Sequence, residues 1–111
     1  MSKSIWLSYD LGVKGDYSSL YAWLDNHKAT ECGDSFAFLP YEVADDEDLA
    51  IKLKQDLIEA VSFGKTDRIY VIWKSKDNVV HGKFIIGKRK ASPWVGYGDS
   101  VNMDDTSMDD I

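Results

Sequence analysis

Alternation of apolar and polar side chains marks several short segments of the chain as strands. The pattern has a period of two over residues 4–10 and again over residues 35–42, beyond a turn at Cys32-Gly33-Asp34 that makes a hairpin with a short strand near residues 28–31. Residues 67–74, DRIYVIWK, are apolar at almost every position, which predicts a central strand. Residues 79–90 follow a turn and predict one more strand.

Two other segments have the spacing of amphipathic helices. The first is expected over about residues 17–27, with Asp16 as its N-cap. The second follows an acidic run, so Asp45 or Asp46 is expected to cap it, acidic side chains to fill its first turn, and Gly64 to stop it. Its predicted buried stripe consists of Leu49, Leu53, Leu57, Ile58 and Val61.

The order of these elements predicts an α+β fold. The sequence β-α-β-β-α-β-β, with right-handed crossovers, places the first strand and the strand at 68–73 side by side in the centre of an antiparallel sheet. Two helices then cover one face of that sheet. The expected architecture is a ferredoxin-like split β-α-β sandwich with an extra C-terminal strand.

Composition places this fold in a single domain. Of 111 residues, 44% are hydrophobic, which is enough for one core, and the domain is expected to span residues 1–98. A single cysteine, Cys32, excludes an internal disulfide framework and a cysteine-rich zinc site. The chain begins without a signal-peptide pattern and has no apolar run of about 20 residues, so we expect a cytoplasmic protein with no membrane partner.

Charge is distributed unevenly along the chain. The formal net charge is −6, but residues 99–111 contain five acids and no base, which predicts an acidic, disordered tail. Within 74–90 one acidic residue stands against six basic ones, which form a candidate nucleic-acid-binding strip: Lys74, Lys76, Lys83, Lys88, Arg89 and Lys90. The alternative is a solvated edge strand whose lysines discourage pairing with another sheet.

Asp10 is the candidate for chemistry, because it ends the first strand before a loop that contains Gly12 and Gly15. A carboxylate there is a metal ligand, a general base or a solvated loop residue. Together with the segments DSFAFLPYEV and LKQDLIEAV and the following DRIYVIW, Tyr9-Asp10 gives a layout that resembles the Cas2 and VapD-like group of small ferredoxin-like proteins.

This resemblance implies a site and an assembly. It implies that Asp10 is a catalytic and metal-binding residue, which holds Mg²⁺ or Mn²⁺ together with its copy across a homodimer axis in a metal-dependent endonuclease. It also implies a dimer interface at the C-terminal end of the domain, where Trp94, Val95 and Tyr97 are the candidates. The alternative is a non-catalytic protein-interaction module, an adaptor, antitoxin or inhibitor in microbial or phage defence, whose acidic surface binds a basic protein.

Overall fold

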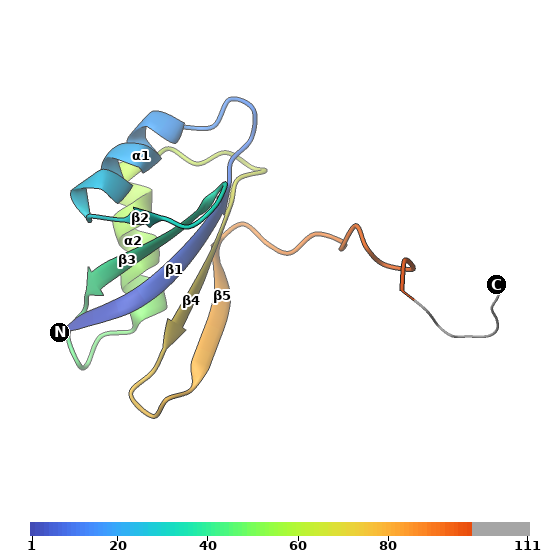
Figure 1. Cartoon of the computed structure of the whole chain (residues 1–111). Coiled ribbons are helices and arrows are strands. Elements are labelled where there is room, and N and C mark those ends of the chain that lie inside the picture. Colours follow the sequence, from blue (N-terminus) through green and yellow to red (C-terminus); the bar gives the residue numbers. More distant parts are fainter. Residues whose placement is uncertain (99–111) are drawn as a thin grey trace.

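The chain folds into one antiparallel sheet with two helices packed against it (Figure 1). The structure is a computed structural model that describes residues 1–98. In chain order, the elements are β1 (Ser2–Asp10), α1 (Tyr17–Asn26), β2 (Thr30–Glu31), β3 (Phe36–Glu42), α2 (Leu49–Ala60), β4 (Arg68–Lys74) and β5 (Val80–Ile86). The predicted α+β class is therefore confirmed, and the arrangement is compatible with a ferredoxin-like fold. None of the helices in this part of the chain is long and apolar enough to cross a membrane.

The strands lie in the order β2-β3-β1-β4-β5, and every neighbouring pair is antiparallel. β1 and β4 are central neighbours, as the sequence predicts. The strands are shorter than expected at two places. β2 has two residues and begins at Thr30, whereas β5 ends at Ile86 because Gly87 adopts φ 72°, a left-handed conformation that breaks the extended strand.

The caps of the two helices were predicted with different success. Asp16 caps α1 as expected, since its carboxylate accepts a hydrogen bond from the Ser19 N–H at 3.3 Å. The expected cap of α2 at Asp45 or Asp46 is wrong: Asp48 is the N-cap, and its carboxylate accepts from the Ile51 N–H at 3.1 Å. No acidic residue lies in the first turn of α2. The helix ends at Ala60, four residues before the expected stop.

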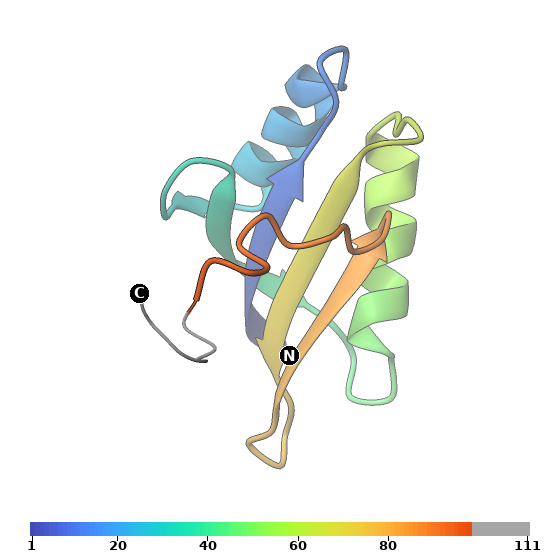
Figure 2. The ribbon, with the colours of Figure 1, turned by 90° about the vertical axis from the view of Figure 1, so that its right-hand side faces the viewer.

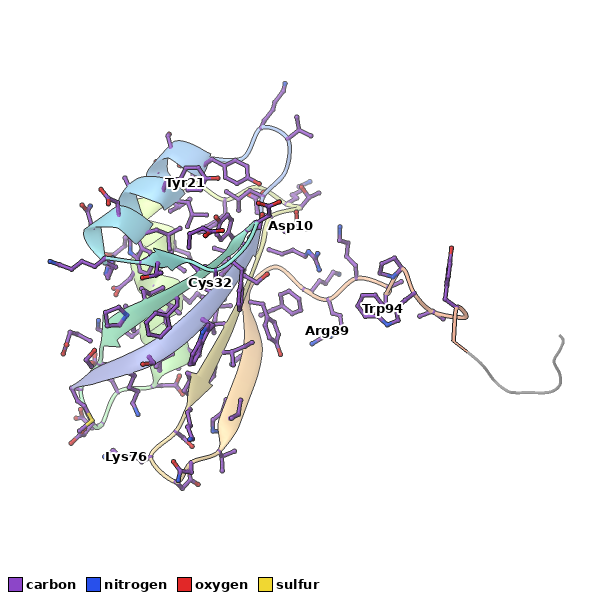
Figure 3. The ribbon with its side chains drawn as sticks, in the orientation of Figure 1. Asp10, Tyr21, Cys32, Lys76, Arg89 and Trp94 are labelled. Atoms are coloured by element: carbon purple, nitrogen blue, oxygen red, sulfur yellow. The ribbon has the colours of Figure 1, made fainter. Side chains whose placement is uncertain are left out.

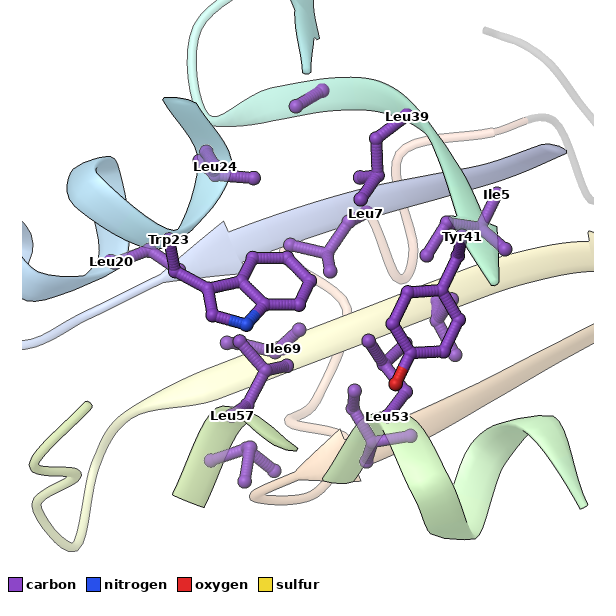
Figure 4. Close-up of a cluster of buried hydrophobic side chains, with 14 of the residues drawn as sticks. Ile5, Leu7, Leu20, Trp23, Leu24, Leu39, Tyr41, Leu53, Leu57 and Ile69 are labelled. Carbon is purple, nitrogen blue, oxygen red and sulfur yellow. The ribbon is translucent and has the colours of Figure 1, made fainter. Parts of the chain in front are cut away.

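Both helices pack on the same face of the sheet and bury a core between the layers (Figures 1 and 4). Trp23 and Tyr41 fill the space between the helices and β3, with ring centroids 6.3 Å apart. Four of the five residues predicted to be the buried stripe of α2 are in this core, but Ile58 is 53% exposed. The buried position is instead Ala50, because Ile58 continues the solvent-facing line that begins at Ile51.

No helix of residues 1–98 covers the other face of the sheet (Figure 2). Along β1, Ile5 and Leu7 are fully buried on the helix side, whereas Trp6 and Ser8 are half-buried on the other side. β4 repeats the pattern, which explains why its sequence is apolar on both faces. The segment that follows β5 leaves the sheet on this uncovered side and extends away from it (Figures 1 and 2).

Candidate functional site

We call four aromatic residues on the uncovered side of the sheet the aromatic face: Trp6, Phe38, Tyr70 and Phe84. The strand register places them in two pairs, because directly opposite residues share a side of the sheet. The ring centroids of Trp6 and Phe38 are 5.2 Å apart, and those of Tyr70 and Phe84 are 4.8 Å apart in an edge-to-face arrangement. All four rings are partly exposed.

A glycine on β5 makes room for one of these rings. The end of the Tyr70 ring lies against the backbone of Gly82, and any Cβ at that position would overlap the Tyr70 hydroxyl. Because Gly82 has no side chain, the Tyr70 ring leans across β5 beside Phe84. Gly82 therefore makes room for a partly exposed aromatic side chain and not for a residue of the core.

Charged side chains gather at one end of the aromatic face, where β1 ends and β4 begins (Figure 3). Arg68 donates to the Asp10 carboxylate at 2.9 Å, and the Lys90 ammonium lies 4.0 Å from the same oxygen. The Arg89 guanidinium lies over the rings of Phe84 and Tyr70, at 5.2 and 5.8 Å from their centroids. We call Arg68, Arg89 and Lys90 the cationic end.

Two adjoining hollows open at the cationic end. The first, of about 300 Å³, is lined by Ser8, Asp10, Arg68, Tyr70, Phe84 and Arg89. The second, of about 440 Å³, shares three of these residues and continues along the segment from Lys90 to Trp94. The Arg68 Nε is buried and has no hydrogen-bond partner within residues 1–98. A buried donor left in this condition is costly.

The surroundings of Asp10 bear on its predicted role as a metal ligand. One oxygen of the Asp10 carboxylate already accepts from Arg68, and a guanidinium at that distance repels a divalent cation. No group of three acidic, histidine or cysteine residues that could hold a metal exists within residues 1–98. Residues 1–98 of one chain therefore supply no group of several protein ligands for Mg²⁺ or Mn²⁺, and an ion at Asp10 stays a prediction. A site shared with the Asp10 of a second copy stays a prediction.

The six predicted nucleic-acid-binding residues do not form one patch. Arg89 and Lys90 lie at the cationic end, just after the exposed Lys88. Lys74 and Lys76 lie at the opposite end of the sheet, where Lys76 pairs with Asp45 at 3.7 Å (Figure 3). Lys83 is opposite the buried Val71, which places it on the helix side.

The sequence reasoning missed Arg68, Tyr70 and Phe84 as site residues. For Tyr70, the available signal is the second apolar face of β4, which also indicates a central strand. The candidate interface residues Trp94, Val95 and Tyr97 lie on the segment after β5 and are 70%, 74% and 87% exposed. The predicted acidic tail, residues 99–111, lies outside the described residues.

Comparisons with known proteins bear on the identity of this site. The resemblance to the Cas2 and VapD-like group is neither supported nor refuted by them and stays a prediction. The chain matches no family model, no curated protein and no solved structure.

Proposed function

We propose that the chain is a ferredoxin-like, cytoplasmic protein that binds single-stranded nucleic acid on its aromatic face and cationic end. One observation carries this proposal: the Arg89 guanidinium lies over the rings of Tyr70 and Phe84 on a sheet face that no helix covers. Proteins that bind single strands combine cations that contact the backbone with aromatic rings on which bases stack. Both kinds of group meet here.

The two parts of the site would take different parts of the ligand. Arg68, Arg89 and Lys90 supply three positive charges against the single charge of Asp10, so the cationic end attracts phosphate. Phe84 and Tyr70 border the same hollow and offer ring surface to a base.

Binding is a separate proposal from cleavage. For an endonuclease with Mg²⁺ or Mn²⁺ at Asp10, we propose that the second carboxylate comes from the Asp10 of another chain, because Arg68 already pairs with one oxygen of this carboxylate. The comparison that tests cleavage is wild type against Asp10→Asn with either metal present. Equal rates for the two proteins would show that Asp10 is not a catalytic residue.

Fluorescence anisotropy with labelled single-stranded DNA and RNA tests the binding proposal. The titrations are repeated over a range of salt, with the full chain and with a chain that ends at Gly98, because the five acidic residues of 99–111 would compete with phosphate if they bound the cationic end. With three phosphate contacts, the logarithm of the affinity should fall with the logarithm of salt with a slope of about −2. Replacing Arg89 with alanine should reduce that slope by about 0.7.

Two further variants separate stacking from charge. Phe84→Leu keeps an apolar side chain but removes the ring, so it should weaken binding by about 1–3 kcal/mol and leave the salt slope unchanged. Lys54→Ala is the matched control, since it removes an exposed cation of α2 on the helix side of the sheet. It should alter neither value. The absence of binding at low salt by both chain lengths would overturn the proposal.

A second candidate function is the protein-interaction module, an adaptor, antitoxin or inhibitor. Trp94, Val95 and Tyr97 favour it, because these three large apolar side chains are mostly exposed on one short segment of turns, where docking on another protein would remove them from water. We propose the same residues as a homodimer interface. Sedimentation velocity on wild type and on the triple alanine variant tests this assembly. A monomer for both proteins over a wide concentration range would contradict the homodimer.

A further inference from the structure

A separate hollow lies on the helix side, at the edge of the sheet where α1 passes β2. It has a volume of about 240 Å³ and is lined by three aromatic residues, two acidic residues and four others, in chain order Tyr9, Tyr21, Leu24, Asp25, Ala29, Thr30, Glu31, Phe36 and Ala37. We call it the tyrosine hollow, and Tyr21 marks it in Figure 3. Asp10 and Tyr9 are neighbours that point to opposite sides of β1, so the sheet separates this hollow from the cationic end.

Aromatic rings form the wall of the tyrosine hollow next to α1. The centroids of Tyr9 and Tyr21 are 6.2 Å apart with an interplanar angle of 76°. Tyr17 supports both rings from outside the hollow, at 5.6 Å from Tyr21 and 6.5 Å from Tyr9. The rings are therefore held in place by one another, and they present π-electron surface in more than one direction.

The charge of the tyrosine hollow is negative. Asp25 and Glu31 line it, and none of its lining residues is basic. Burial raises the pKa of Tyr9, and Tyr21, Tyr17 and Glu31 raise it further, which keeps the phenol neutral. Ring faces and carboxylates both attract positive charge, so the aromatic wall and the two carboxylates of the hollow all favour a cationic ligand.

We propose that the tyrosine hollow binds an alkylammonium group, the end of a lysine side chain, methylated or not, on a basic protein partner. The volume lies below the range of pockets that hold whole drug-sized molecules, which suits a single side chain. The inference does not depend on nucleic-acid binding, because the two sites share no residue. It names the chemical group, a lysine ammonium, through which a basic protein partner would contact this chain.

A pair of probes that differ only in charge tests the inference. The first is Nα-acetyl-trimethyllysine methylamide, and the second carries a tert-butyl group in place of the trimethylammonium group. Each is titrated into ¹⁵N-labelled full-length protein and followed by amide chemical shifts. The cation should shift the amides around Asp25 and Glu31 and bind more than about fivefold more tightly than its neutral isostere. Equal binding of the two probes would overturn the inference.

Variants locate the binding and keep the test independent of folding. Tyr21 is 52% exposed, so Tyr21→Ala removes a wall with little effect on the core and should weaken the cationic probe by about fivefold. Tyr21→Phe keeps the ring and should bind within about twofold of wild type. Glu31→Gln should weaken the cation and not the isostere. Ile51→Ala, at a comparably exposed position on α2, is the control outside the hollow. Unchanged affinity in both Tyr21→Ala and Glu31→Gln would refute the assignment.

Discussion

Asp67 is the buried carboxylate on which the geometry of the candidate site depends. It is 3% exposed, and its two oxygens accept from the backbone N–H groups of Gly12 and Gly64, each at 2.7 Å. The side chain therefore ties the loop after β1 and the loop after α2 to the start of β4. The ion pair between Asp10 and Arg68 lies next to this connection.

The structure gives the size of the effect of Asp67→Ala. The substitution leaves two backbone N–H groups without their acceptors, and each such loss costs about 1–3 kcal/mol. Both bonds are partly buried, so water reaches the freed groups in part, and we expect a total loss of about 3 kcal/mol in the free energy of unfolding. Asp67→Asn should lose about half as much, because its amide oxygen still accepts one bond.

Urea unfolding followed by tryptophan fluorescence measures this loss. The matched control is Asp46→Ala, an exposed acidic residue before α2, which should change the stability by less than about 0.5 kcal/mol. In conditions where Asp67→Ala is still folded, its nucleic-acid affinity should also fall, because Asp10 and Arg68 are no longer held together. A stability within about 1 kcal/mol of wild type would refute the argument from the two hydrogen bonds.

Substitutions at two adjacent residues of α2 should lower the stability by very different amounts, and two titrating groups should shape the pH dependence of the stability. Leu57→Ala should lose about 2–5 kcal/mol in urea unfolding, and Ile58→Ala less than about 0.5, since only Leu57 is buried. Burial, followed by the hydrogen bond to Asp56, raises the pKa of Tyr41, so stability should fall as pH rises above the ordinary value of 10.0; Tyr41→Phe should lack this decline in alkaline unfolding curves. Hydrogen bonds from backbone N–H groups, first that of Ser62, lower the pKa of Asp16, so its contribution to the free energy of unfolding should be lost as pH falls below 3.8. In acid unfolding, the Asp16→Asn variant should lack this loss of stability.

Local patterns predict most of the fold because the helices and strands each have a clear period. The α2 cap shows where such patterns fail. Four consecutive acidic residues, 45–48, all suit a helix start, and the choice of Asp48 depends on burying Leu49 and Ala50 against the sheet. The exposure of Ile58 has the same origin, because its position relative to the sheet is fixed by tertiary packing.

The site is harder to predict than the fold, because it is assembled from strands that are distant in sequence. Asp10 and Arg68 are 58 residues apart, and only the register of β1 with β4 makes them neighbours. Conversely, the basic residues of 74–90 are close together in the sequence but lie apart in the structure. Lys83 points away from its neighbour Phe84, and the hairpin between β4 and β5 carries Lys76 to the far end of the sheet.

The proposed nucleic-acid site and the proposed dimer segment are physically linked. Arg89 and Lys90 belong to the cationic end, yet they begin the segment that leads to Trp94. If that segment docks on a second copy in a new direction, it takes two of the three cations with it and leaves only Arg68 beside Asp10. In that arrangement, dimerisation through Trp94 would change the charge of the cationic end, and the two proposed activities would depend on each other.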